Sequence, residues 1–209
     1  MKEYHKIETI FERDMSGSKK LIEGNYRDST IEYLKDCTWS FTEKIDGTNI
    51  RVHWDGHKIS FGGRTSKASI PANLMNYLND TFSNNVMEEM FEQMFGEKQV
   101  TLYGEGYGAS IQKVGSLYRD DVSFILFDIM INDVYLHRHN VERIATALGI
   151  DIVPIVFTGT IPEAVKFVKS NPDSTIGTAK MEGVVGRPQL ELMDRLGKRL
   201  IVKIKVCDF

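Results

Sequence analysis

The most informative stretch of this chain is residues 43–49, Glu43-Lys44-Ile45-Asp46-Gly47-Thr48-Asn49. The residues before it predict a strand over 38–44, and Asp46-Gly47 predicts a turn directly after that strand. Lys44 would then lie at a strand end, at the mouth of a pocket. A surface lysine beside a hairpin turn is the ordinary alternative, and residues 43–49 alone do not exclude it.

Two segments near the carboxyl end give Lys44 a chemical context. They read Met-Glu-Gly-Val-Val over residues 181–185 and Leu-Ile-Val-Lys-Ile-Lys over residues 200–205. Lys203 and Lys205 occupy alternate positions of the second segment, so a strand would present both on one face. Burial and nearby cations both lower the pKa of a lysine and so favour its nucleophilic, neutral form. The three segments together predict a site where the Lys44 amine attacks a nucleoside triphosphate.

Composition sets wide limits. The chain has 209 residues, 42% of them hydrophobic and 26% charged, as in an ordinary globular protein. No run of 18 apolar residues indicates a membrane span, and no apolar signal core follows Met1. The two cysteines, Cys37 and Cys207, have no metal-ligand spacing, which favours a reduced, cytoplasmic protein.

Charge neither supports nor excludes a nucleic-acid substrate. A formal net charge of -3 is a mild obstacle, because phosphates attract Lys and Arg. The stretch 195–205 nevertheless carries five basic residues and no acidic one, namely Arg195, Lys198, Arg199, Lys203 and Lys205. It is either a local basic face or a solvated charged hairpin.

Hydrophobic patterns predict more strands than helices. Strands are expected over 38–44, 49–54, 58–61, 100–103, 122–131, 152–158, 183–187 and 199–206. Helices are expected over 29–36, 73–79, 84–95, 140–149 and 162–170. Several strands are joined by hairpin-length loops. We therefore expect an α+β fold of mainly antiparallel sheets flanked by helices, in a single domain over residues 1–209.

Further polar and aromatic residues could serve a nucleotide. Arg64 follows a Gly-Gly pair and could grip a phosphate in a two-pronged contact. Glu105 stands between glycines at an expected strand end, where it could accept hydrogen bonds from ribose hydroxyls. Phe127 could stack on a purine. The alternatives are a surface arginine, a tight turn and a buried core aromatic, and all three stay open.

Acidic residues suggest a metal. Glu182 heads a buried strand, and a buried acid needs a partner such as a divalent cation or a lysine. Because Mg²⁺ takes few carboxylates and retains waters, Asp46 and Glu182 could hold it through its hydration shell.

The order of these motifs along the chain resembles that of a known superfamily. Lys44-x-Asp-Gly-x-Asn49, Arg64, Gly-Glu105-Gly, Phe127-Asp and Glu182-Gly-Val-Val precede Lys203-Ile-Lys in the order seen in covalent nucleotidyltransferases. That superfamily comprises the polynucleotide ligases and mRNA capping enzymes. Asn at position 49 and Ile-Gln-Lys over 111–113 are similar to the RNA ligases of the phage double-strand-RNA-sealing and RNA editing type. The resemblance implies a nucleotidyltransferase (ATP-grasp-like) domain.

Carried over residue by residue, the resemblance implies several nucleotide contacts. Glu43 would help recognise adenine, mainly through its backbone. Asn49 and Arg64 would contact phosphates of the nucleotide or of the RNA end. Glu105 would bind the ribose, and Phe127 would stack on adenine.

The resemblance also implies the catalytic groups. Lys44 would become covalently bound to AMP, while Lys203 and Lys205 would contact the α-phosphate. Asp46 and Glu182 would serve the metal, Mg²⁺ or Mn²⁺. Asp46 departs from the histidine that is common at this position in closely related RNA ligases.

The implied activity is that of an ATP-dependent RNA ligase acting on RNA with 5′-phosphate and 3′-hydroxyl ends, in a nicked duplex, as a monomer. No oligonucleotide-binding (OB) barrel or helical domain follows Lys205 in this sequence. We therefore expect either a truncated adenylyltransferase core or a naturally minimal ligase whose sealing is assisted by an accessory domain or protein. The alternatives are the adenylation domain of an ATP-dependent DNA ligase, a capping guanylyltransferase and a non-catalytic RNA-end-binding module.

Overall fold

The structure, a computed structural model, describes residues 1–194 and 197–209, and these form two compact units. Unit 1 contains Met1–His5 and Asp46–Val153, and unit 2 contains Lys6–Ile45 and Pro154–Phe209. Both units combine helices with mainly antiparallel strands, which confirms the predicted α+β class. A single adenylyltransferase domain over residues 1–209 stays a prediction.

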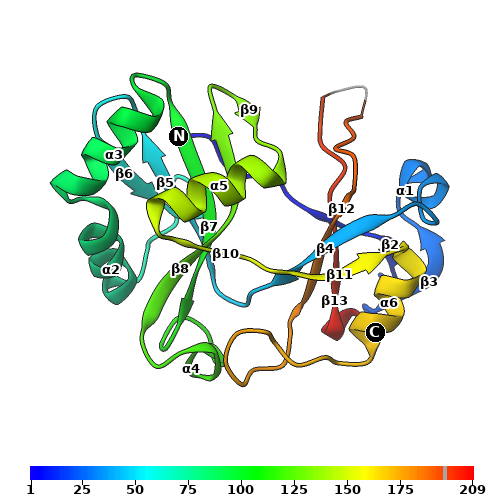
Figure 1. The fold of residues 1–209 in the computed structure, drawn as a ribbon. Helices are drawn as coiled ribbons and strands as arrows, with labels where there is room; N and C mark the ends of the chain where they lie inside the picture. The colour runs from blue at the N-terminus through cyan, green and yellow to red at the C-terminus, as the bar shows by residue number, and fades with distance from the viewer. Residues whose placement is uncertain (195–196) are drawn as a thin grey trace. The chain divides into compact units, whose positions relative to one another are not determined.

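The main sheet of unit 2 has the strand order β1-β13-β12-β4-β11 (Figure 1). Its neighbouring strands are antiparallel except for the parallel pair β1 and β13, and β2 pairs with β3 beside it. The strands are β1 (Glu8–Thr9), β2 (Phe11–Arg13), β3 (Leu21–Tyr26), β4 (Trp39–Lys44), β11 (Ile155–Gly159), β12 (Gly183–Pro188) and β13 (Val202–Lys205). The helical segments are α1 (Ser29–Tyr33), α6 (Ile161–Lys169) and the 3₁₀ turn Val206–Asp208.

Strand β4 explains why Lys44 faces away from the core of unit 2. Side chains alternate between the two faces of a strand, and Trp39, Phe41 and Glu43 are buried while the residues between them are half-buried. Trp39 and Phe41 pack in one cluster with apolar residues of α6, β12 and β13. Fully burying one such side chain stabilises a fold by roughly 1.5–3 kcal/mol. This burial holds Lys44 on the opposite face.

The register of this sheet places the distant segments side by side. Gly183 pairs with Lys44 on one side and with Lys205 on the other. Two residues along β12, Val185 lies between Thr42 and Lys203 in the same way. Lys44, Lys203 and Lys205 therefore lie on one face of the sheet, as alternation along each strand requires.

Unit 1 is built on a sheet with the order β10-β8-β7-β5-β6, with β9 paired to β8 (Figure 1). Neighbouring strands are antiparallel apart from the parallel pair β10 and β8. The strands are β5 (Thr48–Trp54), β6 (Ile59–Gly62), β7 (Val100–Gly108), β8 (Val122–Ile131), β9 (Val134–Tyr135) and β10 (Asp151–Ile152). The helices are α2 (Ala72–Phe82), α3 (Asn85–Phe95), α4 (Gly115–Tyr118) and α5 (Arg138–Leu148).

Helices α2, α3 and α5 pack against the sheet of unit 1. One cluster joins the buried residues of these helices, among them Leu78, Phe91 and Val141, to Val52 and Leu102 of the sheet. Within the described part of the chain, no helix combines the length and apolarity needed to cross a bilayer.

The prediction of one continuous strand over 152–158 was wrong, because the structure has two strands there, β10 and β11. β10 pairs with β8 of unit 1, whereas β11 pairs with β4 of unit 2. Pro154 lies between them and has no N–H to continue a ladder. The Val153 N–H still donates to Leu126 O, and the Pro154 carbonyl accepts from the Glu43 N–H.

Other boundaries also differ. The strand expected over 100–103 continues to Gly108, because Gly104 gives room to the Phe124 ring of β8: a Cβ there would lie 2.3 Å from it. Helix α5 begins at Arg138 after His137 rather than after Asn140. Strands β1, β2 and β3 were not predicted at all.

Gly183 tests the strand packing around Lys44. A Cβ at this position would lie 2.1 Å from Ile204 O and 2.7 Å from Lys205 Cα. Because both atoms belong to the backbone of β13, Gly183→Ala must push β12 and β13 apart. We expect the free energy of unfolding in denaturant to fall by about 3 kcal/mol.

Gly149→Ala is the control, since Gly149 has φ +66° and a Cβ there would meet nothing within 4 Å. Left-handed backbone alone should cost about 1–2 kcal/mol. A Gly183→Ala variant no less stable than this control would contradict the packing argument.

Candidate active site

A single carboxylate in unit 2 joins two of the predicted catalytic lysines. Glu182 Oε2 lies 2.6 Å from Lys44 Nζ, and Glu182 Oε1 lies 2.8 Å from Lys205 Nζ. All three side chains are mostly buried. The register brings the two lysines to either side of Gly183, and Glu182 directly precedes that glycine.

Lys203 completes a cationic cluster. Burial lowers the pKa of Lys203, and the charges of Lys44 and Lys205 lower it further, while Glu8 and Asp208 act in the opposite direction. Burial also opposes the charged form of Lys205, but its hydrogen bond and charge pairing with Glu182 outweigh burial and raise the pKa of Lys205. The sheet thus concentrates positive charge beside Lys44, as the attack on a triphosphate would require.

Glu43 lies on the other face of β4, where its carboxylate accepts three hydrogen bonds from protein donors. It is 1% exposed. Its Oε1 accepts from Ser174 Oγ at 2.5 Å, and its Oε2 accepts from Thr175 N at 2.9 Å and Thr175 Oγ1 at 2.5 Å. The predicted role of the Glu43 backbone in adenine recognition stays a prediction.

In unit 1, two predicted nucleotide contacts face each other across a strand pair. Asn49 of β5 is paired in register with Glu105 of β7, where Glu105 is half-buried. Asn49 Oδ1 is buried and has no hydrogen-bond partner in the described residues. A buried amide oxygen without a donor is costly unless a ligand supplies one. The pair therefore suits contact with a polar nucleotide group.

The turn after Lys44 is braced by the loop between β7 and β8. Gln112 Nε2 donates to Gly47 O at 2.9 Å, and the Asp46 N–H donates to Tyr118 Oη at 3.4 Å. A Cβ on Gly47 would lie 2.3 Å from Gly106 O and 2.8 Å from Glu105 Cγ. Glycine is needed here because the turn lies directly against β7.

Arg64 is exposed on a turn that buried groups hold in place. Arg51 is 2% exposed, and its Nε donates to Gly63 O at 2.8 Å. Glu3 Oε1 accepts from the Ser66 N–H at 3.0 Å. The turn therefore presents Arg64 to solvent from an anchored backbone, which suits a phosphate contact.

Phe127 lies within β8 rather than at its end, and its ring is half-buried. Tyr4 packs edge-on against it, with ring centroids 5.1 Å apart. The Tyr4 hydroxyl donates to Asp128 Oδ2 at 2.6 Å. The residue is thus partly a packing aromatic, while one part of its surface remains available to a ligand.

The predicted site residues fall into two sets. Lys44, Glu43, Glu182, Lys203 and Lys205 belong to unit 2, whereas Asp46, Asn49, Arg64, Glu105 and Phe127 belong to unit 1. A pocket that combines both sets stays a prediction.

A metal site formed by Asp46 and Glu182 also stays a prediction. In residues 1–194 and 197–209 there is no group of three or more His, Cys, Asp or Glu side chains that could hold a metal ion. Mg²⁺ needs no such group when substrate phosphates and waters complete its shell, and one or two carboxylates suffice. The Glu182 carboxylate is of the right type.

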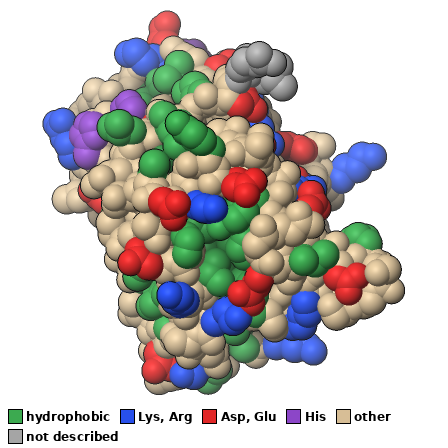
Figure 2. All heavy atoms as spheres, turned by 90° about the vertical axis from the view of Figure 1, so that its right-hand side faces the viewer, with side chains coloured by type: hydrophobic (Ala, Val, Ile, Leu, Met, Phe, Trp, Pro, Cys, Tyr) green, Lys and Arg blue, Asp and Glu red, His purple; other side chains and the backbone are tan. Residues whose placement is uncertain are grey.

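The basic stretch 195–205 is not one continuous basic face. Arg199 is buried and paired with Glu191 at 3.4 Å, and Lys203 and Lys205 belong to the cluster around Glu182. Arg195 lies outside the described residues. Lys198 lines a cavity of about 190 Å³ whose other walls are mixed: the basic residues Lys6, Arg27 and Arg199, the acidic residues Glu8, Asp28 and Asp194, and apolar side chains such as Ile31 and Leu200. Figure 2 shows one face of the molecule, on which hydrophobic side chains gather near the centre with both charge types around them.

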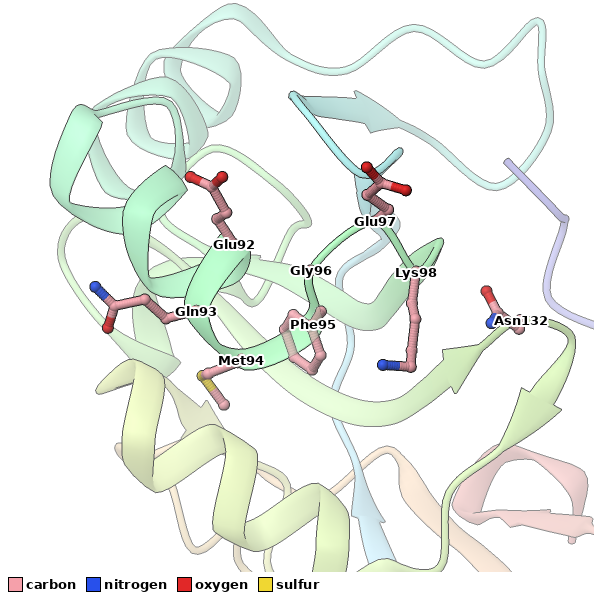
Figure 3. A pocket seen from close by; sticks show the side chains of 8 residues that line it. All are labelled: Glu92, Gln93, Met94, Phe95, Gly96, Glu97, Lys98 and Asn132. Carbon is pink, nitrogen blue, oxygen red and sulfur yellow. The ribbon is translucent and has the colours of Figure 1, made fainter.

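A larger pocket of about 540 Å³ lies at the end of α3 (Figure 3). It is lined by Glu92, Gln93, Met94, Phe95, Gly96, Glu97, Lys98 and Asn132. It contains none of the predicted site residues, and its two glutamates outnumber its one lysine. Its charge is wrong for a triphosphate, so this pocket is not the candidate site.

Sequence reasoning missed several residues that support the site. Ser174 and Thr175 gave no signal beyond a polar loop, and Tyr118 read as part of a connection between strands. Tyr4 lies in the first forty residues, whose role the sequence did not reveal. Ser174-Thr175 is one of several adjacent hydroxyl pairs, with Ser29-Thr30 and Thr65-Ser66, so nothing in the sequence singled it out.

The comparisons with known proteins agree with this fold and show the family. Residues 38–205 match the family model described as RNA ligase, and the chain belongs to that family. Those residues include all of the predicted site residues. No curated protein sequence matches the chain.

Solved structures share the fold. Naegleria gruberi RNA ligase with PPi has a TM-score of 0.63 and 22% identity, with 98% of this chain and 62% of that chain covered. A mutant of the same ligase with ATP and Mn has a TM-score of 0.65 and 21% identity, with 97% and 59% covered. A further mutant, with AMP and Mn, has a TM-score of 0.63 and 22% identity, with 95% and 60% covered. This chain therefore spans about three-fifths of the length of the ligases that it matches.

Lys203 should make stability depend on alkaline pH. Its lowered pKa means that the folded state disfavours the ammonium form. Lys203→Met removes that charge, so the melting temperature at pH 7 should rise. As pH climbs from the lowered folded value toward the ordinary lysine value of 10.5, the unfolded wild type binds more protons than the folded one. The stability of the wild type should then increase relative to that of the variant. The difference between their melting temperatures should therefore shrink as the pH rises.

The exposed Lys58→Met variant controls for loss of a lysine as such. Melting curves between neutral pH and pH 10.5 provide the measurement. A Lys203→Met protein that is less stable than wild type at neutral pH would show that the argument has the wrong sign.

Proposed function

We propose that this chain is an ATP-dependent RNA ligase, or the adenylyltransferase core of one, with Lys44 as the nucleophile. The observation that carries the proposal is the register of β13, β12 and β4, which places Lys44 and Lys205 on either side of Gly183 with Glu182 bridging them. Three lysines gathered on one sheet face need a strongly anionic ligand, and a triphosphate is one.

In the first step, the Lys44 amine attacks the α-phosphorus of ATP. An N–P bond forms, the bond from the α-phosphorus to the bridging oxygen breaks, and pyrophosphate leaves. The amine must first lose a proton, for which the Glu182 carboxylate at 2.6 Å would be the acceptor, and the pair then opens so that the nitrogen can reach phosphorus. Lys203 and Lys205 would stabilise the charge that builds up on the phosphate oxygens.

Two further transfers complete the reaction. The 5′-phosphate of an RNA attacks the lysyl-AMP phosphorus, which breaks the N–P bond, frees Lys44 and leaves an adenylylated RNA end. The neighbouring 3′-hydroxyl then attacks the 5′-phosphate, a phosphodiester forms and AMP leaves. Lys44 is therefore regenerated in each cycle.

Residues of unit 1 would bind the nucleotide and the RNA end. Asn49 and Glu105, which face each other across β5 and β7, would hold phosphate and ribose groups, and Phe127 would stack on adenine. Arg64 would contact a phosphate from its anchored turn. Mg²⁺ or Mn²⁺, held by Glu182 and Asp46, would supply charge neutralisation at the phosphates.

The relatives support this reading. The Naegleria gruberi ligase is solved with ATP and Mn, with AMP and Mn, and with PPi. In the proposed reaction, ATP is consumed and PPi released in lysine adenylylation, and AMP is released in the sealing step. The proposed substrate is a nicked RNA duplex, with an accessory domain or protein aiding the sealing step and the chain acting as a monomer. A cytoplasmic setting is supported by the free thiols of Cys37 and Cys207.

Lysine adenylylation provides the direct test. Incubation with ATP and Mg²⁺ or Mn²⁺ should add the mass of one AMP to the intact protein, and Lys44→Ala should abolish the adduct because no other amine takes its place. Lys169→Ala is a matched control, since Lys169 also pairs with a glutamate, Glu23, but at an exposed position. Wild-type protein that stays unmodified across metals and pH would contradict the proposal.

Substrate choice is a separate prediction. The adenylylated protein should join nicked duplex RNA more efficiently than single-stranded RNA or nicked DNA, as seen by product length on a denaturing gel. Joining of nicked DNA alone would identify a DNA ligase domain, and labelling by GTP rather than ATP would identify a capping guanylyltransferase. RNA-end binding without an adduct would identify a binding module.

A further inference from the structure

We propose that Glu43 is a positioning residue, whose buried carboxylate fastens segment 173–182 to β4 and thereby sets Glu182 against Lys44. The inference rests on the proposed function and deepens it, because it assigns to the residue before the nucleophile a task other than adenine contact. It stands on contacts within unit 2 alone.

The contacts of Glu43 satisfy its carboxylate from one short segment. Three donors reach it, the two hydroxyls of Ser174 and Thr175 and the Thr175 amide, at 2.5–2.9 Å. A carboxylate has about four acceptor positions, so three of them are used. Burying a carboxylate until it is 1% exposed is costly unless such donors satisfy it. The cost of separating them is correspondingly high.

Backbone hydrogen bonds connect the two ends of segment 173–182. Fixing the position of one end therefore also restricts the position of the other. Asp173 and Lys180 form a β-bridge, and Ser174 N donates to Ala179 O at 2.9 Å. Met181 N donates to Pro172 O at 3.0 Å, and the Met181 side chain is 3% exposed. Glu182 is the next residue along this small hairpin.

The same segment therefore contacts both faces of the end of β4. On the core face, Ser174 and Thr175 bind Glu43. On the opposite face, Glu182 pairs with Lys44 at 2.6 Å. Glu43 and Lys44 are neighbours in one strand and necessarily point in opposite directions. Fixing the first contact therefore restricts how far the second can move.

Pairing within the sheet alone does not account for the position of Glu182. Strand β12 begins at Gly183, so Glu182 lies outside it, although the Val206 N–H donates to Glu182 O at 3.0 Å. The Glu43 contacts supply the remaining restraint on the chain that leads into β12.

The experiment compares Glu43→Gln, Thr175→Val and the double variant in single-turnover adenylylation. Thr175→Val removes one hydroxyl and keeps the shape of the side chain. Each single variant should lower the rate of AMP transfer to Lys44 roughly tenfold, the equivalent of one hydrogen bond to a charged group. The KM for ATP should stay within about twofold, because neither change touches the nucleotide. The double variant should be little slower than Glu43→Gln alone, because both substitutions disrupt the same contact between Glu43 and Thr175.

Thr158→Val, at an exposed position of β11 in the same unit, is the control and should leave the rate unchanged. Unchanged rates in Glu43→Gln and Thr175→Val would overturn the inference. So would a raised KM for ATP in Glu43→Gln with no effect of Thr175→Val, because that result makes Glu43 a nucleotide ligand.

Hydrogen exchange separates this inference from the proposed function. The amides of Thr175 and of residues 181–183 should exchange faster in Glu43→Gln than in wild type, whether or not ATP is consumed. If wild-type protein forms no AMP adduct, the proposed function fails while this measurement still decides the contact. Unchanged exchange at these amides would overturn the positioning role.

Discussion

The Glu182 carboxylate, shared between Lys44 and Lys205, is the interaction on which the arrangement of unit 2 depends. Two cations this close would repel each other, and one anion between them offsets that repulsion over short distances. The contact requires β4, β12 and β13 to hold one register. A slip of a single residue would turn every side chain of a strand to the other face and bury Lys44. The apolar side chains of Trp39, Phe41 and Ile204 oppose such a slip.

The alternation of residue types predicted part of this site correctly. The strand predicted over 38–44 placed Lys44 at a strand end, and the alternation over 202–205 indicated that Lys203 and Lys205 would share a face. The partner of Glu182 could not be predicted, because a metal and a lysine satisfy a buried acid equally well in principle. Only the register shows that two lysines lie within hydrogen-bond distance of it.

Where prediction failed, long-range contacts or backbone chemistry outweighed the local pattern. Gly104 and its neighbours looked like the end of a strand, yet the ring of Phe124 needs the space that glycine leaves, and the ladder continues. The run over 152–158 looked uniform, but Pro154 separates two pairings. Asn140 looked like a helix cap, although the helix begins earlier. The weakly patterned strands β1 to β3 derive their stability from partners that no local window contains.

The split at Pro154 has a consequence for the modular construction of the protein. The chain leaves unit 2 after Ile45 and returns at Pro154, and Glu43 and Pro154 are joined by a backbone hydrogen bond while Thr42 and Ile155 are ladder partners. Exit and re-entry thus occur on adjacent strands, as in a domain inserted into a hairpin. Such an insert can grow or diverge over evolution with little disturbance to its host sheet, because both ends of the excursion are already anchored side by side.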